Sequence, residues 1–169
     1  MKDDFDIKRL GLADWRDLKA IRLDALKQDP QFFLRRYEDE ILQGDEFWQK
    51  SFAADMQDKR AIFGVYAQSR IIGMGGVSPD NDDADGARLG GGYIAKAYRG
   101  NGFAHRLISA RIAWARANPA YRSLYLSHRL GNAPSQTVAL KAGFALLKQQ
   151  RIQWPDGGYD DELIYRLTL

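Results

Sequence analysis

The apolar residues of this chain recur with two different periods. From Phe103 to Asn118 they fall three or four positions apart, which predicts an amphipathic helix. Its buried stripe is expected to hold Phe103, Leu107, Ala110 and Trp114, with Ile108, Ile112 and Ala115 beside them. The solvent side is then expected to hold Arg106, Arg111 and Arg116.

Elsewhere the pattern predicts shorter elements. Helices are expected over residues 14–27 with Asp14 as N-cap, from Asp45, and over 132–142 with Gly143 ending it, while 31–43 is a short irregular helix or loop. Strands are expected over residues 5–10, 61–68, 71–78, 93–94, 121–128, 144–153 and 163–169, with turns at 69–70 and 154–158. This order predicts one mixed α/β (α+β) domain over residues 1–169, with a strand–loop–helix–strand unit at its centre.

Composition narrows the classes of protein that fit. The chain has 169 residues, of which 45% are hydrophobic, so it can bury a core. Its net charge of +3 is spread along the sequence, which does not favour nucleic acid and suits an anionic small molecule or a CoA-like polyanion. The absence of cysteine excludes disulfides, cysteine metal sites and a thiol nucleophile, and no metal site is expected. The acidic start and the lack of a long apolar run predict a cytoplasmic protein without a membrane segment.

The segment from Leu89 to Asn118 carries the clearest chemistry. Three glycines, Gly90 to Gly92, precede the short β-prone pair Tyr93-Ile94 and indicate either a bulge or a close crossing. A basic glycine loop, residues 98–102, then leads into the helix. Such a loop aims unpaired backbone N–H groups at one point beside the positive end of the helix dipole. The sequence therefore predicts an anion site, most naturally one for phosphate.

Two common phosphate motifs do not match this loop. A P-loop needs Lys and Ser or Thr directly after its last glycine, and neither follows Gly102. A dinucleotide-binding loop needs another glycine where His105 stands, and an acid at the end of the next strand, which offers Ser123 and Ser127 instead. The pattern that remains is Arg99-x-x-Gly102-x-Ala104 directly after a strand.

This pattern resembles the signature of the GNAT family of acyl-CoA-dependent N-acetyltransferases. Residues 132–144, NAPSQTVALKAGF, are similar to the second block of the family, and residues 22–32 and 158–163 also look like family segments. The resemblance therefore covers nearly the whole chain in order. It implies a mostly antiparallel sheet of about seven strands, flanked by helices, with a splayed parallel pair at its centre.

The resemblance also implies roles for particular residues. The diphosphate of acetyl-CoA would be held at Arg99, Gly100, Asn101, Gly102, Phe103 and Ala104, with Arg99 adding charge. The pantetheine arm would lie along Gly92, Tyr93 and Ile94 like an added strand, and Asn132 would contact it. The N–H of Ile94 would face the thioester carbonyl in an oxyanion-hole role.

The proton-transfer groups depart from the family pattern. Where the family often has a tyrosine as general acid, this chain has Ala139, and where it often has a glutamate as general base, this chain has Ser127. Ser135 is the best substitute for stabilising the leaving thiolate, unless it serves only as a first-turn helix hydroxyl. His128 can relay a proton if its ring faces inward; the alternative is a solvated strand end. The acidic run 38–40 is expected to be a solvated face or to attract a cationic amine.

Two functions follow from these residues. The first is transfer of acetyl from acetyl-CoA to a primary amine, on a small molecule or a protein N-terminus, by direct attack in a ternary complex. The second is a non-catalytic acyl-CoA-binding or sensor module, which the residues at positions 127 and 139 favour. A homodimer is compatible with the family likeness.

Overall fold

The fold is built on one seven-stranded sheet. A computed structural model describes residues 5–53 and 57–169, so the first residues of the acidic start lie outside it. The strand order is β1-β2-β3-β4-β5-β7-β6, and every neighbouring pair is antiparallel except β4–β5. The strands are β1 (Phe5–Arg9), β2 (Ala61–Ala67), β3 (Arg70–Pro79), β4 (Gly86–Ile94), β5 (Ser123–Arg129), β6 (Ala145–Gln153) and β7 (Tyr159–Thr168).

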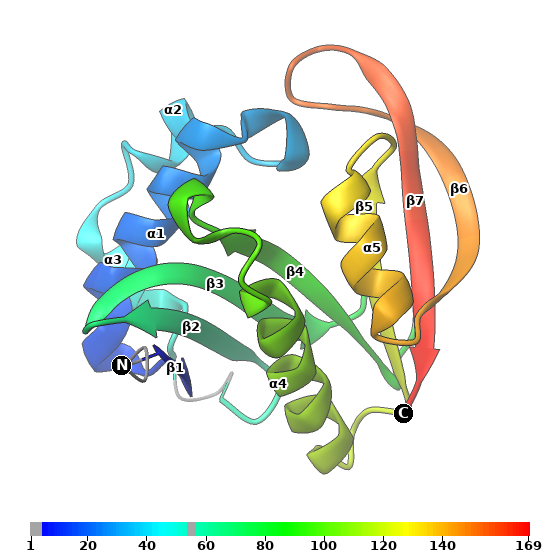
Figure 1. Cartoon of the computed structure of the whole chain (residues 1–169), viewed down its shortest axis with the longest axis horizontal. Helices are drawn as coiled ribbons and strands as arrows, with labels where there is room; N and C mark the ends of the chain where they lie inside the picture. The colour runs from blue at the N-terminus through cyan, green and yellow to red at the C-terminus, as the bar shows by residue number, and fades with distance from the viewer. Residues whose placement is uncertain (1–4, 54–56) are drawn as a thin grey trace.

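Helices cover both faces of the sheet (Figure 1). One face carries α4 (Phe103–Ala117) and α5 (Ala133–Lys141). The other carries α1 (Trp15–Gln28), α2 (Tyr37–Glu40) and α3 (Asp45–Lys50). Short 3-10 turns are η1 (Leu12–Asp14), η2 (Pro30–Phe32) and η4 (Lys96–Tyr98). None of the helices in the described part of the chain has the length and apolarity that a membrane crossing would need.

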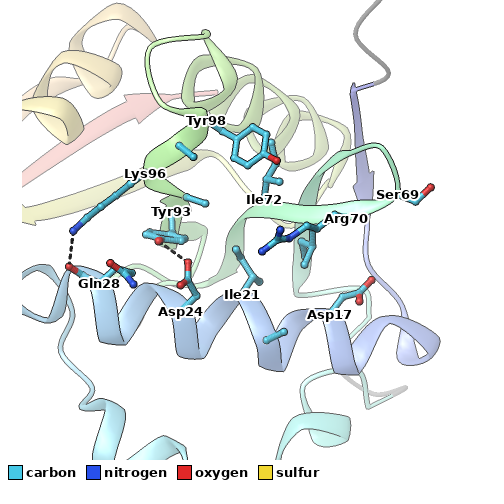
Figure 2. A pocket seen from close by; sticks show the side chains of 14 residues that line it. Asp17, Ile21, Asp24, Gln28, Ser69, Arg70, Ile72, Tyr93, Lys96 and Tyr98 are labelled. Carbon is cyan, nitrogen blue, oxygen red and sulfur yellow. Dashed lines mark hydrogen bonds between the residues drawn. The ribbon is translucent and has the colours of Figure 1, made fainter.

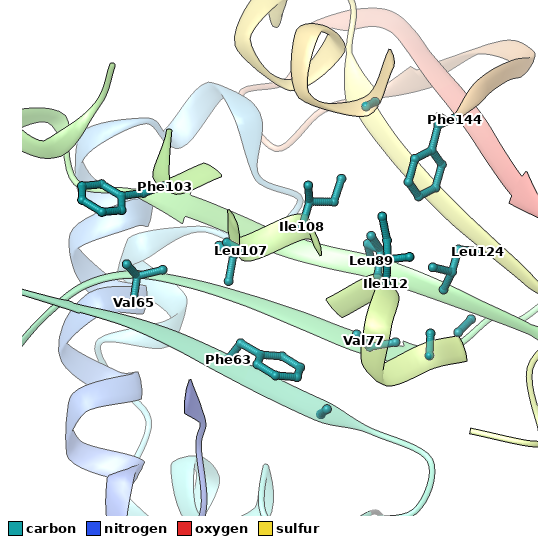
Figure 3. Close-up of a cluster of buried hydrophobic side chains, with 14 of the residues drawn as sticks. Phe63, Val65, Val77, Leu89, Phe103, Leu107, Ile108, Ile112, Leu124 and Phe144 are labelled. Carbon is teal, nitrogen blue, oxygen red and sulfur yellow. The ribbon is translucent and has the colours of Figure 1, made fainter. Parts of the chain in front are cut away.

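Two apolar clusters hold the layers together. Figure 3 shows the first, where Leu107, Ile108 and Ile112 of α4 pack on the strands. Each of these side chains is buried, as the helical period predicted. The second lies between the sheet and α1, where Leu18, Ile21 and Leu26 are buried with aromatic residues of the neighbouring elements. Burial of each such aliphatic side chain contributes about 1.5–3 kcal/mol, so the clusters fix α1 and α4 against the strands between them.

The parallel pair β4–β5 separates along its length. Its ladder begins at Gly86 with Ser123 and ends at Leu89 with Leu126, after which neither strand pairs with the other. Opposite this point, the β3–β4 register shifts between Met74 and Gly76, and Gly91 has φ +62. The register shift and the positive φ place a bulge at Gly91, where β4 diverges from β5. Figure 1 shows the two strands diverging. The predicted splayed pair is confirmed.

Some predicted boundaries were wrong. The β2–β3 turn is Gln68-Ser69, one residue early, because both adopt positive φ (47 and 67) in a tight hairpin turn. β5 starts at Ser123 because the N–H of Tyr121 still donates within the preceding turn. β7 starts at Tyr159 rather than 163, since it pairs with β5 and β6 on its two edges. Asp14 precedes α1, but its carboxylate accepts the N–H of Gly11 rather than one from the helix.

Arg111 was placed wrongly. It was expected on the solvent side of α4, yet its side chain is only 4% exposed. Arg106 and Arg116, by contrast, are exposed as predicted. Arg111 follows Phe103 and Leu107 at intervals of four, so it occupies the buried stripe of the helix despite its charge.

Candidate functional site

The loop before α4 presents free backbone amides. Gly102 is the N-cap of α4 with φ +78, and no side chain caps the helix. The first N–H to be used is that of Arg106, which donates to the carbonyl of Gly102 at 3.1 Å. Among the described residues, the four amides from Gly102 to His105 have no acceptor. This leaves a cluster of donors at the positive end of a fifteen-residue helix, which fits a diphosphate.

The side chains of the loop brace it from behind. Asn101 donates through Nδ2 to the carbonyls of Tyr98 and Arg99, each at 3.2 Å. The guanidinium of Arg99 turns back to pair with Asp29 and donates through Nε to the carbonyl of Ile94 at 2.8 Å. Arg99 therefore ties the loop to the end of β4 and to the end of α1. Its charge is neutralised there, so the main chain rather than Arg99 faces an anion.

The gap between β4 and β5 also has free main-chain groups on one side. The N–H of Ala95 donates to the carbonyl of Ile72 on β3 at 2.8 Å. Because backbone groups alternate along a strand, the N–H of Tyr93 also turns toward β3, whereas those of Gly92 and Ile94 turn toward β5. The ladder to β5 has already ended at Leu89. Gly92 and Ile94 therefore face the gap between β4 and β5, which we call the slot.

Tyr93 is turned away from the slot. Its side chain lies under α1, where the hydroxyl donates to Asp24 at 2.7 Å. Burial, with Asp24 adding to it, raises the pKa of the Tyr93 hydroxyl above its ordinary value. Of the three predicted slot residues, Gly92 and Ile94 are thus placed to bind an arm through the main chain, and Tyr93 holds β4 to α1.

The second predicted block lies across the slot. Asn132 caps α5 by accepting the N–H of Ser135 through Oδ1 at 3.2 Å, which confirms Asn132 at the start of the helix. Ser135 is half-buried in the first turn of α5. The helix stands against β5, on the same face of the sheet as α4. The structure thus places Ser135 and Asn132 on the opposite side of the slot from β4.

His128 is buried rather than solvated, with an exposed fraction of 6%. Its Nδ1 lies 2.8 Å from the carbonyl of Arg129, which can only accept, so Nδ1 carries the proton. Its Nε2 lies 3.2 Å from the hydroxyl of Tyr165, and the two rings stack with centroids 5.3 Å apart. Nε2 and the hydroxyl of Tyr165 are thus hydrogen-bond partners, and sequence reasoning missed Tyr165 because it lies 37 positions away.

Comparison with known proteins agrees with this geometry. Residues 14–144 match the model of the Acetyltransferase (GNAT) family. The chain belongs to the GNAT acetyltransferase family. A search of curated proteins found no match. Family membership, together with the free amides and the slot, supports acetyl-CoA as the cosubstrate of this GNAT protein.

Solved structures share the complete GNAT fold. An acetyltransferase of the GNAT family from Streptococcus pneumoniae is 21% identical, with a TM-score of 0.85 over 98% of this chain and 100% of its own. The acetyltransferase yncA from Salmonella typhimurium, solved with acetyl-CoA, is 15% identical, with a TM-score of 0.82 over 98% and 94%. A ribosomal-protein-alanine N-acetyltransferase from Brucella melitensis is 21% identical, with a TM-score of 0.81 over 97% and 99%.

A large cavity of about 770 Å³ lies beside the GNAT site, but its walls differ from those of the slot. Figure 2 shows it between α1 and β3, with Asp17, Asp24 and Arg70 around it. Tyr93 and η4 close its other side. The lining includes neither β5 nor the free amides of residues 102–105, so volume alone does not identify the acyl-transfer site here.

A buried ion pair joins α1 to α2. Glu40 was expected to lie on a solvated face or to attract a cationic amine; it is buried and accepts two hydrogen bonds from Arg22, at 2.8 and 2.9 Å. This pairing neutralises Glu40; of the other two acids in the run, which are exposed, Glu38 pairs with Arg36 at 3.5 Å. The α1–α2 pairing was missed because its partners lie 18 residues apart in an irregular region.

Arg129 links the turn after β6 to η2. It donates to Asp156 at 2.6 Å, to Asp160 at 3.1 Å and to the carbonyl of Gln31 at 3.3 Å, and its guanidinium lies over the ring of Trp154. The predicted turn at 154–158 is confirmed, and Arg129 anchors it to η2 through the carbonyl of Gln31. This link was not predicted from the sequence.

Proposed function

We propose that this protein is a single-domain N-acetyltransferase that transfers acetyl from acetyl-CoA to a primary amine by direct attack in a ternary complex. The observation that carries the proposal is the slot: β4 leaves β5 at Leu89 and turns the N–H groups of Gly92 and Ile94 toward the gap. The diphosphate-binding amides lie at the adjoining loop. A donor held by the loop could therefore extend its arm along β4.

The main chain supplies binding and charge stabilisation. The amides from Gly102 to Ala104, with the turn at Gly100 and Asn101, would hold the diphosphate, and Arg99 would keep the loop in place. The N–H of Gly92 would hydrogen-bond the arm, and Asn132 would contact it from across the slot. The N–H of Ile94 would then face the thioester carbonyl and stabilise its developing negative charge.

Proton transfer is assigned to a histidine and a serine rather than to the usual glutamate and tyrosine. The chain has no cysteine to carry the acetyl group, so the amine itself must attack. A lysine-like amine with pKa about 10.4 is neutral in about one molecule in 2,500 at pH 7, a deficit of about 4.6 kcal/mol. We assign the proton relay to His128, whose Nε2 contacts Tyr165, and stabilisation of the leaving thiolate to Ser135.

The acceptor is proposed as a primary amine of one of two classes. One structural relative is named a ribosomal-protein-alanine N-acetyltransferase, which supports a protein N-terminus as one class. A small-molecule amine is the other, since loops of variable sequence form the acceptor side. A cytoplasmic location suits both classes, and a homodimer is compatible with either.

The test is release of thiol from acetyl-CoA. The protein contributes no thiol of its own, so a thiol reagent reports only free CoA. The assay would include a panel of small amines and peptides beginning with Ala or Ser. Release that depends on the amine is the expected result. Thermal stabilisation by CoA with no release on any amine would instead favour a non-catalytic acyl-CoA sensor, the function that Ala139 and Ser127 suggest.

The relay has its own test in Tyr165→Phe. This change removes the hydroxyl that contacts His128 at 3.2 Å and keeps the stacked ring. We expect kcat to fall at least about tenfold with little change in KM for acetyl-CoA, because proton transfer contributes about 10²–10⁴ to rates. Tyr125→Phe is the matched control, because Tyr125 lies on the same sheet as Tyr165 and the change removes a hydroxyl that donates to Asp83. Equal effects of the two changes would remove His128 from the mechanism.

A further inference from the structure

A buried charge without a partner lies beneath β4. Arg111 sits in the third turn of α4 and is 4% exposed. Among the described residues no carboxylate pairs with it, and the one hydrogen bond from its guanidinium runs from Nε to the carbonyl of Leu107 at 3.4 Å. Burial lowers the pKa of this guanidinium to about 10, so it stays charged at neutral pH. Burying an unpaired cation is costly, which calls for a reason in function.

Two glycines make room for this guanidinium. A Cβ on Gly75 would lie 2.9 Å from Cζ and Nη1 of Arg111, closer than real Cβ contacts. A Cβ on Gly92 would lie 3.5 Å from Nη2. The group therefore spans from β3 to β4 and ends against Gly92. It lies at the bulge where β4 turns away from β5, directly beside the main-chain groups that face the slot.

A second arginine approaches the bulge from the other face of the sheet. Nη1 of Arg22 would lie 3.8 Å from a Cβ on Gly91. Its charge, however, is neutralised by Glu40 through two hydrogen bonds at 2.8 and 2.9 Å. Of the two guanidinium groups beside the bulge, only that of Arg111 thus carries a charge that no carboxylate among the described residues neutralises.

We propose that Arg111 is a positioning residue that stabilises negative charge in the slot during acyl transfer. The inference rests on the proposed function. In the reaction the amine nitrogen bonds to the thioester carbon, and the carbon–sulfur bond breaks with its electron pair going to sulfur. The amine gives up a proton, which passes through the relay assigned to His128 to the departing sulfur or to water. Negative charge forms first on the carbonyl oxygen and then on sulfur. A fixed cation one strand away favours both charged species over the neutral thioester.

The decisive readout is the pKa of the thiol of bound CoA. It can be followed by thiolate absorbance of the CoA complex, with the complex of desulfo-CoA, which lacks the thiol, as blank. In Arg111→Met we expect this pKa to rise by about one unit, a tenfold loss of thiolate. We also expect kcat to fall about tenfold or more while KM for acetyl-CoA stays within about threefold. Arg111→Lys should restore most of both, because it keeps the charge.

Two controls separate charge from packing. Arg116→Met changes an exposed arginine of the same helix and should leave the thiol pKa unchanged. Gly75→Ala keeps the charge but pushes the guanidinium aside, so it should raise the thiol pKa in the same direction. This second variant carries the test if Arg111→Met does not fold.

The proposal fails if Arg111→Met, or Gly75→Ala in its place, alters melting temperature or CoA affinity but leaves the thiol pKa where it was. A protein that binds CoA without turning over any amine would refute the proposed function instead. The thiol titration would still decide the role of Arg111 in that case, because it needs only bound CoA.

Discussion

Gly102 offers the sharpest single test of the donor site. It is the N-cap of α4 with φ +78, a left-handed conformation that β-branched residues rarely adopt. An added Cβ would meet nothing within 4 Å of the protein itself. Gly102→Val therefore leaves the packed core alone. It changes only the shape of the loop and the space in front of the free amides.

The two expected effects differ in size. Holding valine at positive φ costs about 1–2 kcal/mol, which lowers stability without unfolding a domain of ordinary stability. Hydrogen bonds to charged groups contribute about 1.5–3 kcal/mol each, so losing two amides from the diphosphate costs about 3–6 kcal/mol. That corresponds to at least about a hundredfold loss of CoA affinity.

Calorimetric titration with CoA, together with thermal melting, measures both effects. Gly157→Val is the matched control, because Gly157 has φ +86, also has open space around its missing Cβ, and lies in the β6–β7 turn. The two variants should lose similar stability, but only Gly102→Val should lose CoA. If Gly102→Val binds CoA as the parent does, the assignment of the diphosphate to this loop is refuted.

Two further predictions concern the charges around the α1–α2 region and the β6–β7 turn. Glu40→Gln leaves Arg22 buried without its anion and should lower the free energy of unfolding by about 3 kcal/mol in urea, whereas the exposed Glu38→Gln should change it by less than about 0.5. The hydrogen bond from Arg129 lowers the pKa of Asp156 below its usual range, so the stability from this pair is present above about pH 4 and is lost as the pH falls further. The melting temperature of Arg129→Met should therefore depend less steeply on pH between pH 5 and 2 than that of the parent. About 1 M NaCl should reduce the slope of the parent in the same way, and an unchanged slope in the variant would contradict the pairing.

The sequence predicted the centre of the fold because its signals there are local. The free amides follow from Gly100 and Gly102, and the glycine run that ends at Gly92 indicated a bulge or a close crossing, whereas the break in the parallel pair was implied by the family resemblance. Such signals need only the conformational freedom of glycine and the period of the helix that begins at Phe103. They hold whatever the rest of the chain does.

Charged and polar side chains were harder to place. Arg99 was expected to add charge at the loop, and its pairing with Asp29 was not foreseen; nor was the burial of His128 against Tyr165. Arg111 follows the apolar stripe, yet charge alone suggested the solvent side. The direction of such a side chain depends on a partner or on space that distant parts of the chain provide, as Gly75 does for Arg111. A single sequence does not display that dependence.

The short ladder between β4 and β5 has a mechanical consequence. In the described part of the chain, the ladder that joins the four-stranded part, β1 to β4, to the three-stranded part, β5 to β7, runs only from Gly86–Ser123 to Leu89–Leu126. Acetyl-CoA bound in the slot would hydrogen-bond to β4 while it contacts the part formed by β5 to β7, and so would hold the two parts together. Binding then becomes partly a matter of rigidity: amide exchange along β4 and β5 should slow with increasing CoA, and the two parts should melt as one.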